Sequence, residues 1–140
     1  MEILIKKIPN KVIVKINLNS IFVQDQERAL EFYTEKLGFV KKHDVPVGQF
    51  KWLTVVSSEE PEGTELLLEP NDNPLSKTFQ KGIFEQGIAA ISFQVDDIST
   101  EYEKLEKLGV KFTMPPTKMG DVTIAVFDDT CGNLIQIMEK

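Results

Sequence analysis

Glu69 is the residue whose type and position best fit a role in catalysis. It follows the apolar run at 66–68 and precedes Pro70. A carboxylate at the end of a buried strand can act as a general base or bind a cationic group of a ligand. An exposed glutamate that ends a strand before a proline turn would give the same pattern. Glu69 is therefore the candidate catalytic residue, and both interpretations stay open.

His43 and Cys131 are the other reactive side chains, and each type occurs once in the sequence. His43 lies in a charged stretch directly after two lysines, which is typical of a surface residue, so we predict no metal ligand there. Cys131 lies in the segment DDTCGN, where Asp128 and Asp129 would raise the pKa of a thiol. We therefore predict that Cys131 is a turn residue and not a nucleophile.

Polar and apolar residues alternate along the predicted strands, and this alternation defines a mixed face that the helices leave uncovered. A concave, mostly apolar surface with a few polar groups is the usual composition of a small-molecule site. The wet rim of a partly open sheet would show the same polar groups. Trp52 would stack on a flat ligand or pack in the core. The candidate ligand-binding residues are Ser20, Phe22, Trp52, Thr54, Ser92, Gln94 and Gln136.

Two copies of one structural unit must position these side chains. A short strand, an aspartate, an amphipathic helix and a Leu-Gly pair occur at 19–38 and again at 91–109. Asp25 and Asp97 are the predicted N-caps, and a glycine ends each helix. The aspartates are 72 residues apart and the Leu-Gly pairs 71 apart, so the repeat slips by one residue inside the helix. Three predicted strands follow each helix, which gives β-α-β-β-β twice.

The repeat sets the predicted boundaries: an N-terminal extension at 1–11, a first module at 12–70, a linker at 71–87 with a short helix, and a second module at 88–140. One helix covers only one side of a small sheet, so the two modules must pair as a single α+β domain. The predicted strands are 12–23, 39–45, 50–57 and 64–69, then 88–95, 110–114, 122–127 and 133–139. Residues 115–120, PPTKMG, are predicted to form a loop over the cleft.

Composition excludes several classes of function. The net charge of −6 over 140 residues argues against nucleic acid or an anionic membrane as a partner. A single cysteine allows no internal disulfide and suits a reducing compartment. No apolar run approaches the roughly 20 residues that span a bilayer, and the N-terminal residues do not resemble a signal peptide. We predict a cytoplasmic protein.

The segments FVQDQERALEFYTEKLGF, VDDISTEYEKLEKLGVKF and DDTCGNLIQIME, in this order and spacing, resemble the vicinal oxygen chelate superfamily. This group contains glyoxalase I, bleomycin-resistance proteins and extradiol dioxygenases. The resemblance covers nearly the whole chain. It implies paired βαβββ modules that form a U-shaped mixed sheet around a cleft, with the helices on the outside. It also implies a homodimer.

Catalytic members of that superfamily bind a divalent metal through one residue from each of four strands. Carried over by position, these residues are Leu18, Ala90, a residue near Glu69, and Gln136. Two are aliphatic and cannot bind a metal, and Gln136 is a weak neutral ligand. The sequence therefore predicts neither a metal site nor another cofactor. A divalent metal is the alternative.

Three functions follow from these observations. The first is a bleomycin-resistance-like protein that binds a small molecule in the cleft without the usual metal. The alternative is a divergent metal-dependent lyase, isomerase or dioxygenase that depends on Glu69 and Gln136. The third is a dimeric interaction or regulatory module with no ligand. The expected partners are an unknown small molecule and a second copy of the chain.

Overall fold

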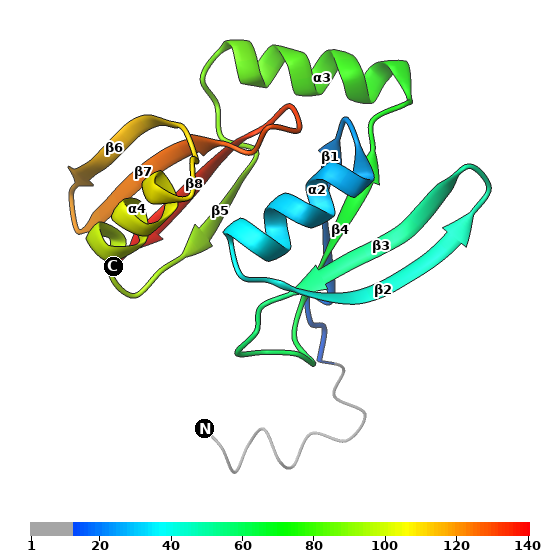
Figure 1. The fold of residues 1–140 in the computed structure, drawn as a ribbon, viewed down its shortest axis with the longest axis horizontal. Coiled ribbons are helices and arrows are strands. Elements are labelled where there is room, and N and C mark those ends of the chain that lie inside the picture. Colours follow the sequence, from blue (N-terminus) through cyan, green and yellow to red (C-terminus); the bar gives the residue numbers. More distant parts are fainter. Residues whose placement is uncertain (1–12) are drawn as a thin grey trace.

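The computed structural model describes residues 13–140, and the predicted extension at 1–11 lies outside this range. Figure 1 shows two strand-and-helix modules side by side, joined by a helix that runs across one end of both. The first module contains β1 (Leu18–Val23), α2 (Gln26–Glu31), η1 (Phe32–Lys36), β2 (Val40–Val47), β3 (Phe50–Val56) and β4 (Glu65–Pro70). Next come α3 (Pro74–Glu85), β5 (Ile91–Gln94), α4 (Ile98–Lys107), β6 (Phe112–Met119), β7 (Val122–Asp128) and β8 (Leu134–Glu139).

Each module is one four-stranded sheet with the same topology. The strand orders are β1-β4-β3-β2 and β5-β8-β7-β6. In each sheet the first strand pairs in parallel with the last, and the other pairs are antiparallel. The prediction of an α+β fold built from two βαβββ modules is confirmed.

The two helix starts follow the predicted capping. The Asp25 carboxylate accepts a hydrogen bond from the Arg28 N–H at 3.0 Å, and the Asp97 carboxylate accepts one from the Thr100 N–H at 3.1 Å. After Glu31 the first helix continues as a π-helical stretch, Phe32–Lys36. A π turn accommodates one extra residue in a helix, which explains the one-residue slip between the repeats.

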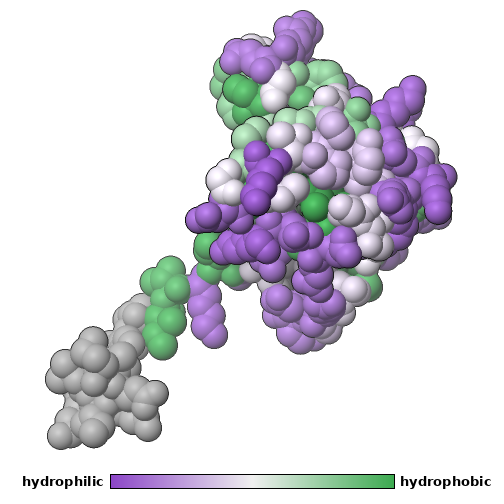
Figure 2. Space-filling model, turned by 90° about the vertical axis from the view of Figure 1, so that its left-hand side faces the viewer, coloured by the Kyte–Doolittle hydropathy of each residue, from purple (hydrophilic) through white to green (hydrophobic). Residues whose placement is uncertain are grey.

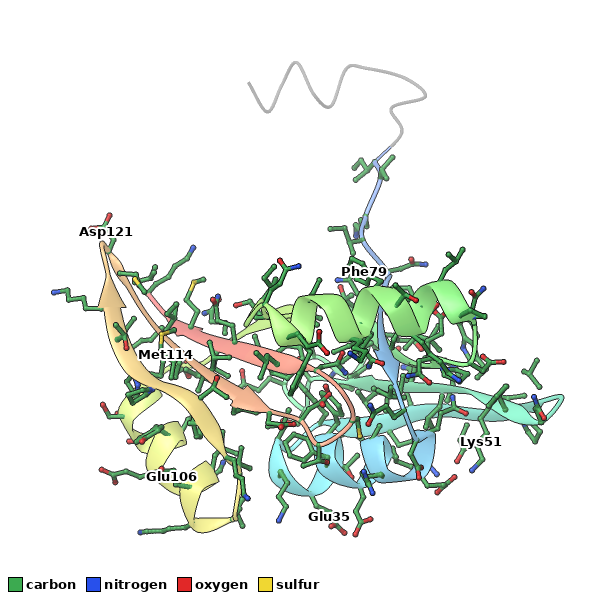
Figure 3. All side chains as sticks on the ribbon, turned by 90° about the horizontal axis from the view of Figure 1, so that it is seen from above. Glu35, Lys51, Phe79, Glu106, Met114 and Asp121 are labelled. Carbon is green, nitrogen blue, oxygen red and sulfur yellow. The ribbon has the colours of Figure 1, made fainter. Side chains whose placement is uncertain are left out.

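One continuous core joins the two modules. The strand residues that face the helices, such as Ile21, Val23 and Ile135, are buried in a single cluster drawn from both sheets. Phe32, where α2 passes into the π-helical stretch, lies 6.1 Å from Phe127 of β7 between ring centroids, so the first module's helix also packs on the second module. Seen from above, α2 and α4 lie on one side of the molecule and α3 on the other (Figure 3). We call the strand faces that α2 and α4 leave uncovered the open faces.

A buried polar cluster fixes the β7–β8 turn against the first module. Asp129 accepts hydrogen bonds from the Tyr33 hydroxyl (2.6 Å) and from the backbone N–H groups of Cys131 (2.7 Å) and Asn133 (3.0 Å). Gln80 of α3 donates to the Asn133 side-chain oxygen and to the Cys131 carbonyl. The helix that spans the linker is therefore attached to the same cluster.

Three predicted elements differ from the structure. Residues 115–120 do not form a loop but belong mostly to β6, with a register irregularity between Met114 and Thr117. β6 is an edge strand, where a proline's missing N–H does not break the ladder. The linker at 71–87 contains the twelve-residue helix α3 where a helix was expected. The first and fifth strands begin at Leu18 and Ile91, later than the β-branched runs suggest.

In the range 13–140, no helix has the length and apolar character needed to cross a membrane.

Candidate functional site

The open face of the first module carries a row of four aligned residues. His43 of β2 lies opposite Thr54 of β3, Thr54 opposite Leu67 of β4, and Leu67 opposite Ser20 of β1. Aligned residues in neighbouring strands point to the same face of a sheet. Ser20 is exposed, whereas Thr54 and Leu67 are buried.

His43, Thr54 and Glu65 form a hydrogen-bonded cluster at this row. The Thr54 hydroxyl donates to Glu65 Oε1 at 2.7 Å and accepts from the His43 backbone N–H at 3.1 Å. His43 Nδ1 lies 2.8 Å from the same Glu65 oxygen. These contacts lower the pKa of Glu65 below its usual value, through the Thr54 hydrogen bond first and the His43 hydrogen bond second. The cluster therefore holds an ionised carboxylate in a fixed orientation at neutral pH.

The second module has the equivalent row with different chemistry. Met114 of β6 lies opposite Val126 of β7, Val126 opposite Gln136 of β8, and Gln136 opposite Ser92 of β5. The Gln136 side-chain amide donates to the Ser92 hydroxyl at 2.9 Å. The structure thus brings two predicted ligand-binding residues together. Both are neutral hydrogen-bonding groups.

The other predicted site residues lie along the same two faces. Trp52 is 41% exposed and pairs across the sheet with Val45, which is 50% exposed. Phe22 is half-buried opposite Glu69, which is also half-buried. Gln94 is exposed opposite Met138.

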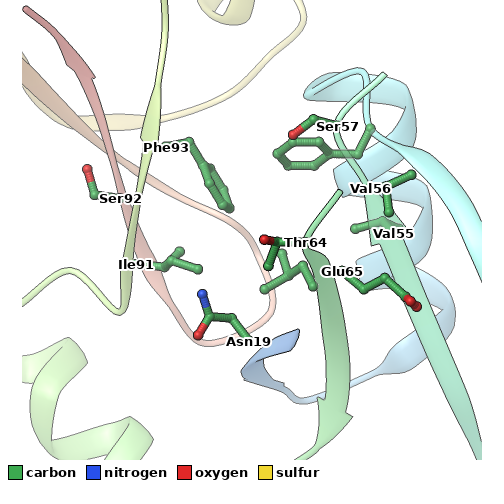
Figure 4. Close-up of a pocket in the computed structure, with 11 residues that line it drawn as sticks. Asn19, Val55, Val56, Ser57, Thr64, Glu65, Ile91, Ser92 and Phe93 are labelled. Carbon is green, nitrogen blue, oxygen red and sulfur yellow. The ribbon is translucent and has the colours of Figure 1, made fainter. Parts of the chain in front are cut away.

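A small cavity of about 200 Å³ lies at the seam between the modules. Figure 4 shows Ile91 and Phe93 entering it from β5 and Thr64 from the start of β4, with Asn19 at its lower edge. The Glu65 stem also lines this cavity, and its carboxylate points away from β5 (Figure 4). A larger hollow of about 600 Å³ lies beside it and is lined in part by Ser92 and Gln94. The seam cavity is smaller than the sites that hold drug-sized ligands.

Cys131 is a structural residue. Its side chain is fully buried, and burial together with the nearby Asp129 charge raises the thiol pKa to about 12. Asp129 and Tyr33 also have raised pKa values, chiefly because both are buried. The prediction of a turn residue at Cys131 agrees with its place between β7 and β8.

Residues 14–137 match the family described as the Glyoxalase/Bleomycin resistance protein/Dioxygenase superfamily. The chain belongs to this superfamily. It is 64% identical over 127 residues to the uncharacterized protein YurT of Bacillus subtilis (strain 168), a match that covers 91% of this chain and 100% of YurT.

Two solved structures extend the comparison within the superfamily. The crystal structure of UcmS2 shares 33% identity and a TM-score of 0.80, covering 92% of this chain and 100% of that chain. TnmS3, described as an antibiotic binding protein from Streptomyces sp. CB03234, shares 25% identity and a TM-score of 0.71, covering 93% of this chain and 98% of that chain. Both support the fold assignment over nearly the full chain.

The sheet registers can be compared with the four positions that the resemblance to the superfamily implies for metal ligands. Ser20 and Ser92 are equivalent in the repeat, and they lie opposite Leu67 and Gln136. Leu67 is therefore the β4 counterpart of Gln136, and Glu69 lies two residues further along the strand. With Leu18 and Ala90, three of the four positions carry aliphatic side chains.

That donor set does not fit a divalent metal, which requires imidazole, carboxylate or thiolate ligands. Within residues 13–140, no group of three or more His, Cys, Asp or Glu side chains is arranged to hold a metal ion.

The sequence did not point to Glu65 or to a role for His43. Glu65 and His43 are separated by 22 residues, and their contact depends on the alignment of β2, β3 and β4. One signal was present, because Glu65 alternates with Leu67 and Glu69 and so belongs to the same strand face.

Proposed function

We propose that this protein binds a small, mostly apolar molecule against its open faces and that it does so without a metal ion. The observation that carries the proposal is the aliphatic character of Leu18, Leu67 and Ala90 at three of the four ligand positions. The exposed Trp52 and the Ser92–Gln136 pair supply the mixed surface that such ligands favour. The likeness to TnmS3, an antibiotic binding protein, supports the same class of function.

The test combines metal analysis with a ligand screen. Protein purified without chelator is expected to contain divalent metal well below one equivalent per chain. Aromatic and peptide-like compounds should raise its unfolding temperature equally with and without EDTA. A ligand at about 100 times its Kd stabilises the folded state by about 2.7 kcal/mol. Stoichiometric metal together with turnover that EDTA abolishes would instead support the metal-dependent lyase, isomerase or dioxygenase.

We further propose a homodimer. Apolar side chains are exposed on α3, where Leu75 is 80% and Phe79 59% exposed. In the face that Figure 2 presents, hydrophobic side chains gather at the upper end above a mostly hydrophilic surface. Exposed apolar patches of this kind mark protein interfaces. Sedimentation equilibrium should give a dimer for the wild type and a weaker dimer for Phe79→Ser, and a monomer in both cases would contradict the proposal.

The cytoplasmic location also remains part of the proposal. The buried free thiol of Cys131 suits a reducing compartment. Fractionation of cells that express the native gene at its own level would test it.

A further inference from the structure

The Glu65 carboxylate retains capacity to bind another group. Within residues 13–140, two side chains form hydrogen bonds with this carboxylate, and both bonds reach Oε1. The partners are Thr54 at 2.7 Å and His43 at 2.8 Å. A carboxylate offers about four acceptor positions. Its side chain is 24% exposed, so an external donor can reach it.

The lysines near Glu65 in the sheet are engaged with other carboxylates. Lys41 pairs with Asp44 at 3.2 Å, and Lys42 with Glu62 at 2.9 Å. Glu65 itself pairs with His43, whose ring is charged only when it is protonated. The His43 and Thr54 contacts both leave Oε2 of Glu65 as the oxygen at which the cationic group of a ligand can bind.

An apolar platform lies on the same face, on the other side of the Thr54 hydroxyl that binds the Glu65 carboxylate. Trp52 is two residues from Thr54 along β3, and Val45 is two residues from His43 along β2. Two residues along a strand correspond to about 7 Å. A molecule with a positive end and a flat or aliphatic body matches this spacing. The equivalent row of the second module, from Met114 to Ser92, carries no charge.

We propose that Glu65 is the counter-ion for a cationic amine group of the ligand, and that Trp52 and Val45 contact the ligand's apolar body. The inference rests on the proposed function and names its ligand class, an amphiphilic amine. Thr54 and His43 act as positioning residues that hold the carboxylate. The overall charge of −6 also attracts cations over anions.

Three probes with one apolar body and different charges test the proposal: 4-phenylbutylamine, 4-phenylbutan-1-ol and 4-phenylbutyrate. Their affinities are measured by titration calorimetry and by quenching of the single tryptophan, Trp52. The wild type should bind the amine about tenfold more tightly than the alcohol, which corresponds to about 1.4 kcal/mol. The acid should bind most weakly. Added salt should reduce the preference for the amine.

Glu65→Gln should remove the preference for the amine while it keeps the affinity for the alcohol. The matched control is Glu62→Gln, which removes the same charge from the neighbouring exposed loop and should keep the preference. His43→Ala removes one of the two hydrogen bonds that orient the carboxylate and should weaken the preference for the amine without abolishing it. Circular dichroism and unfolding temperature verify that each variant is folded.

Equal binding of amine and alcohol by the wild type would overturn the inference, and so would binding of none of the three probes. An amine preference that survives in folded Glu65→Gln would also overturn it. A compound from the ligand screen that binds wild type and Glu65→Gln equally would leave the proposed function standing and remove only this inference.

Discussion

The middle rows of the two open faces align position by position but carry different side chains. In the first module the edge strand β2 and its neighbour β3 carry the polar residues His43 and Thr54, and Leu67 of β4 is apolar. In the second module the corresponding strands β6 and β7 carry the apolar residues Met114 and Val126, whereas Gln136 of β8 is polar and lies beside Ser92. The shared topology therefore fixes where side chains project, whereas the residues at those points make one face charged and the other neutral.

The turns that connect the last two strands of each module also differ. In the second module this turn contains the buried Asp129 and its hydrogen bonds to Tyr33 and Asn133. In the first module the corresponding turn, at 57–64, is mostly exposed. The turn in the second module therefore holds the two modules together, whereas within residues 13–140 the exposed turn in the first module makes no such contacts.

The largest effect on stability is expected from Asp129→Ala, which removes the buried carboxylate that distinguishes the second module's turn from the first module's turn. It leaves the Tyr33 hydroxyl and several N–H groups buried without an acceptor, and the free energy of unfolding should fall by about 3 kcal/mol. Urea denaturation measures this change. Glu59→Ala in the first module's turn is the control and should cost less than about 0.5 kcal/mol. Similar losses for both variants would show that the two turns are equivalent.

Thr54→Val tests whether the polar cluster stabilises the first open face. The variant keeps the side-chain shape but removes the donor to Glu65 and the acceptor for the His43 N–H, so a loss of about 1 kcal/mol is expected. Thr113→Val makes the same chemical change in the second module, where the threonine is exposed, and should have a smaller effect. An unchanged urea midpoint in Thr54→Val would mean that the cluster contributes nothing to folding.

The pH dependence of the free energy of unfolding should distinguish the charged Glu65 cluster of the first open face from the neutral row of the second. The pKa of Glu65 is lowered in the folded protein, so its stabilising contribution is present above the pKa of an unfolded glutamate, about 4.3. That contribution is lost as the pH falls through the lower folded value. The stability difference between wild type and Glu65→Gln should therefore shrink below about pH 4.3. Gln136→Leu should give a difference that does not change over the same pH range.

The smallest effect is expected from Glu69→Gln. Glu69 shares a strand face with Glu65 but lies two residues beyond the row, opposite Phe22. Its replacement should change the free energy of unfolding by less than about 0.5 kcal/mol and leave ligand affinity nearly unchanged. A large loss of binding in Glu69→Gln, measured with the same probes, would restore Glu69 as the central carboxylate of the site.

Local patterns in the sequence were sufficient to predict both modules. The aspartate N-caps, the Leu-Gly exits and the alternation in Ile21 and Val23 each depend on neighbours within a few residues. The same locality explains the errors. Pro115 and Pro116 indicate a break unless the strand is known to lie at a sheet edge, and edge position is a property of the assembled sheet.

The sequence by itself determined the duplicated unit, the buried face of each strand, and the absence of histidine or carboxylate at Leu18 and Ala90. These follow from residue type and period, which folding does not change. Only the tertiary structure decided that Leu67, and not Glu69, is the counterpart of Gln136, and that Glu65 lies beside His43. Alternation tells which face a residue occupies, but the register between strands is set by how the whole sheet packs.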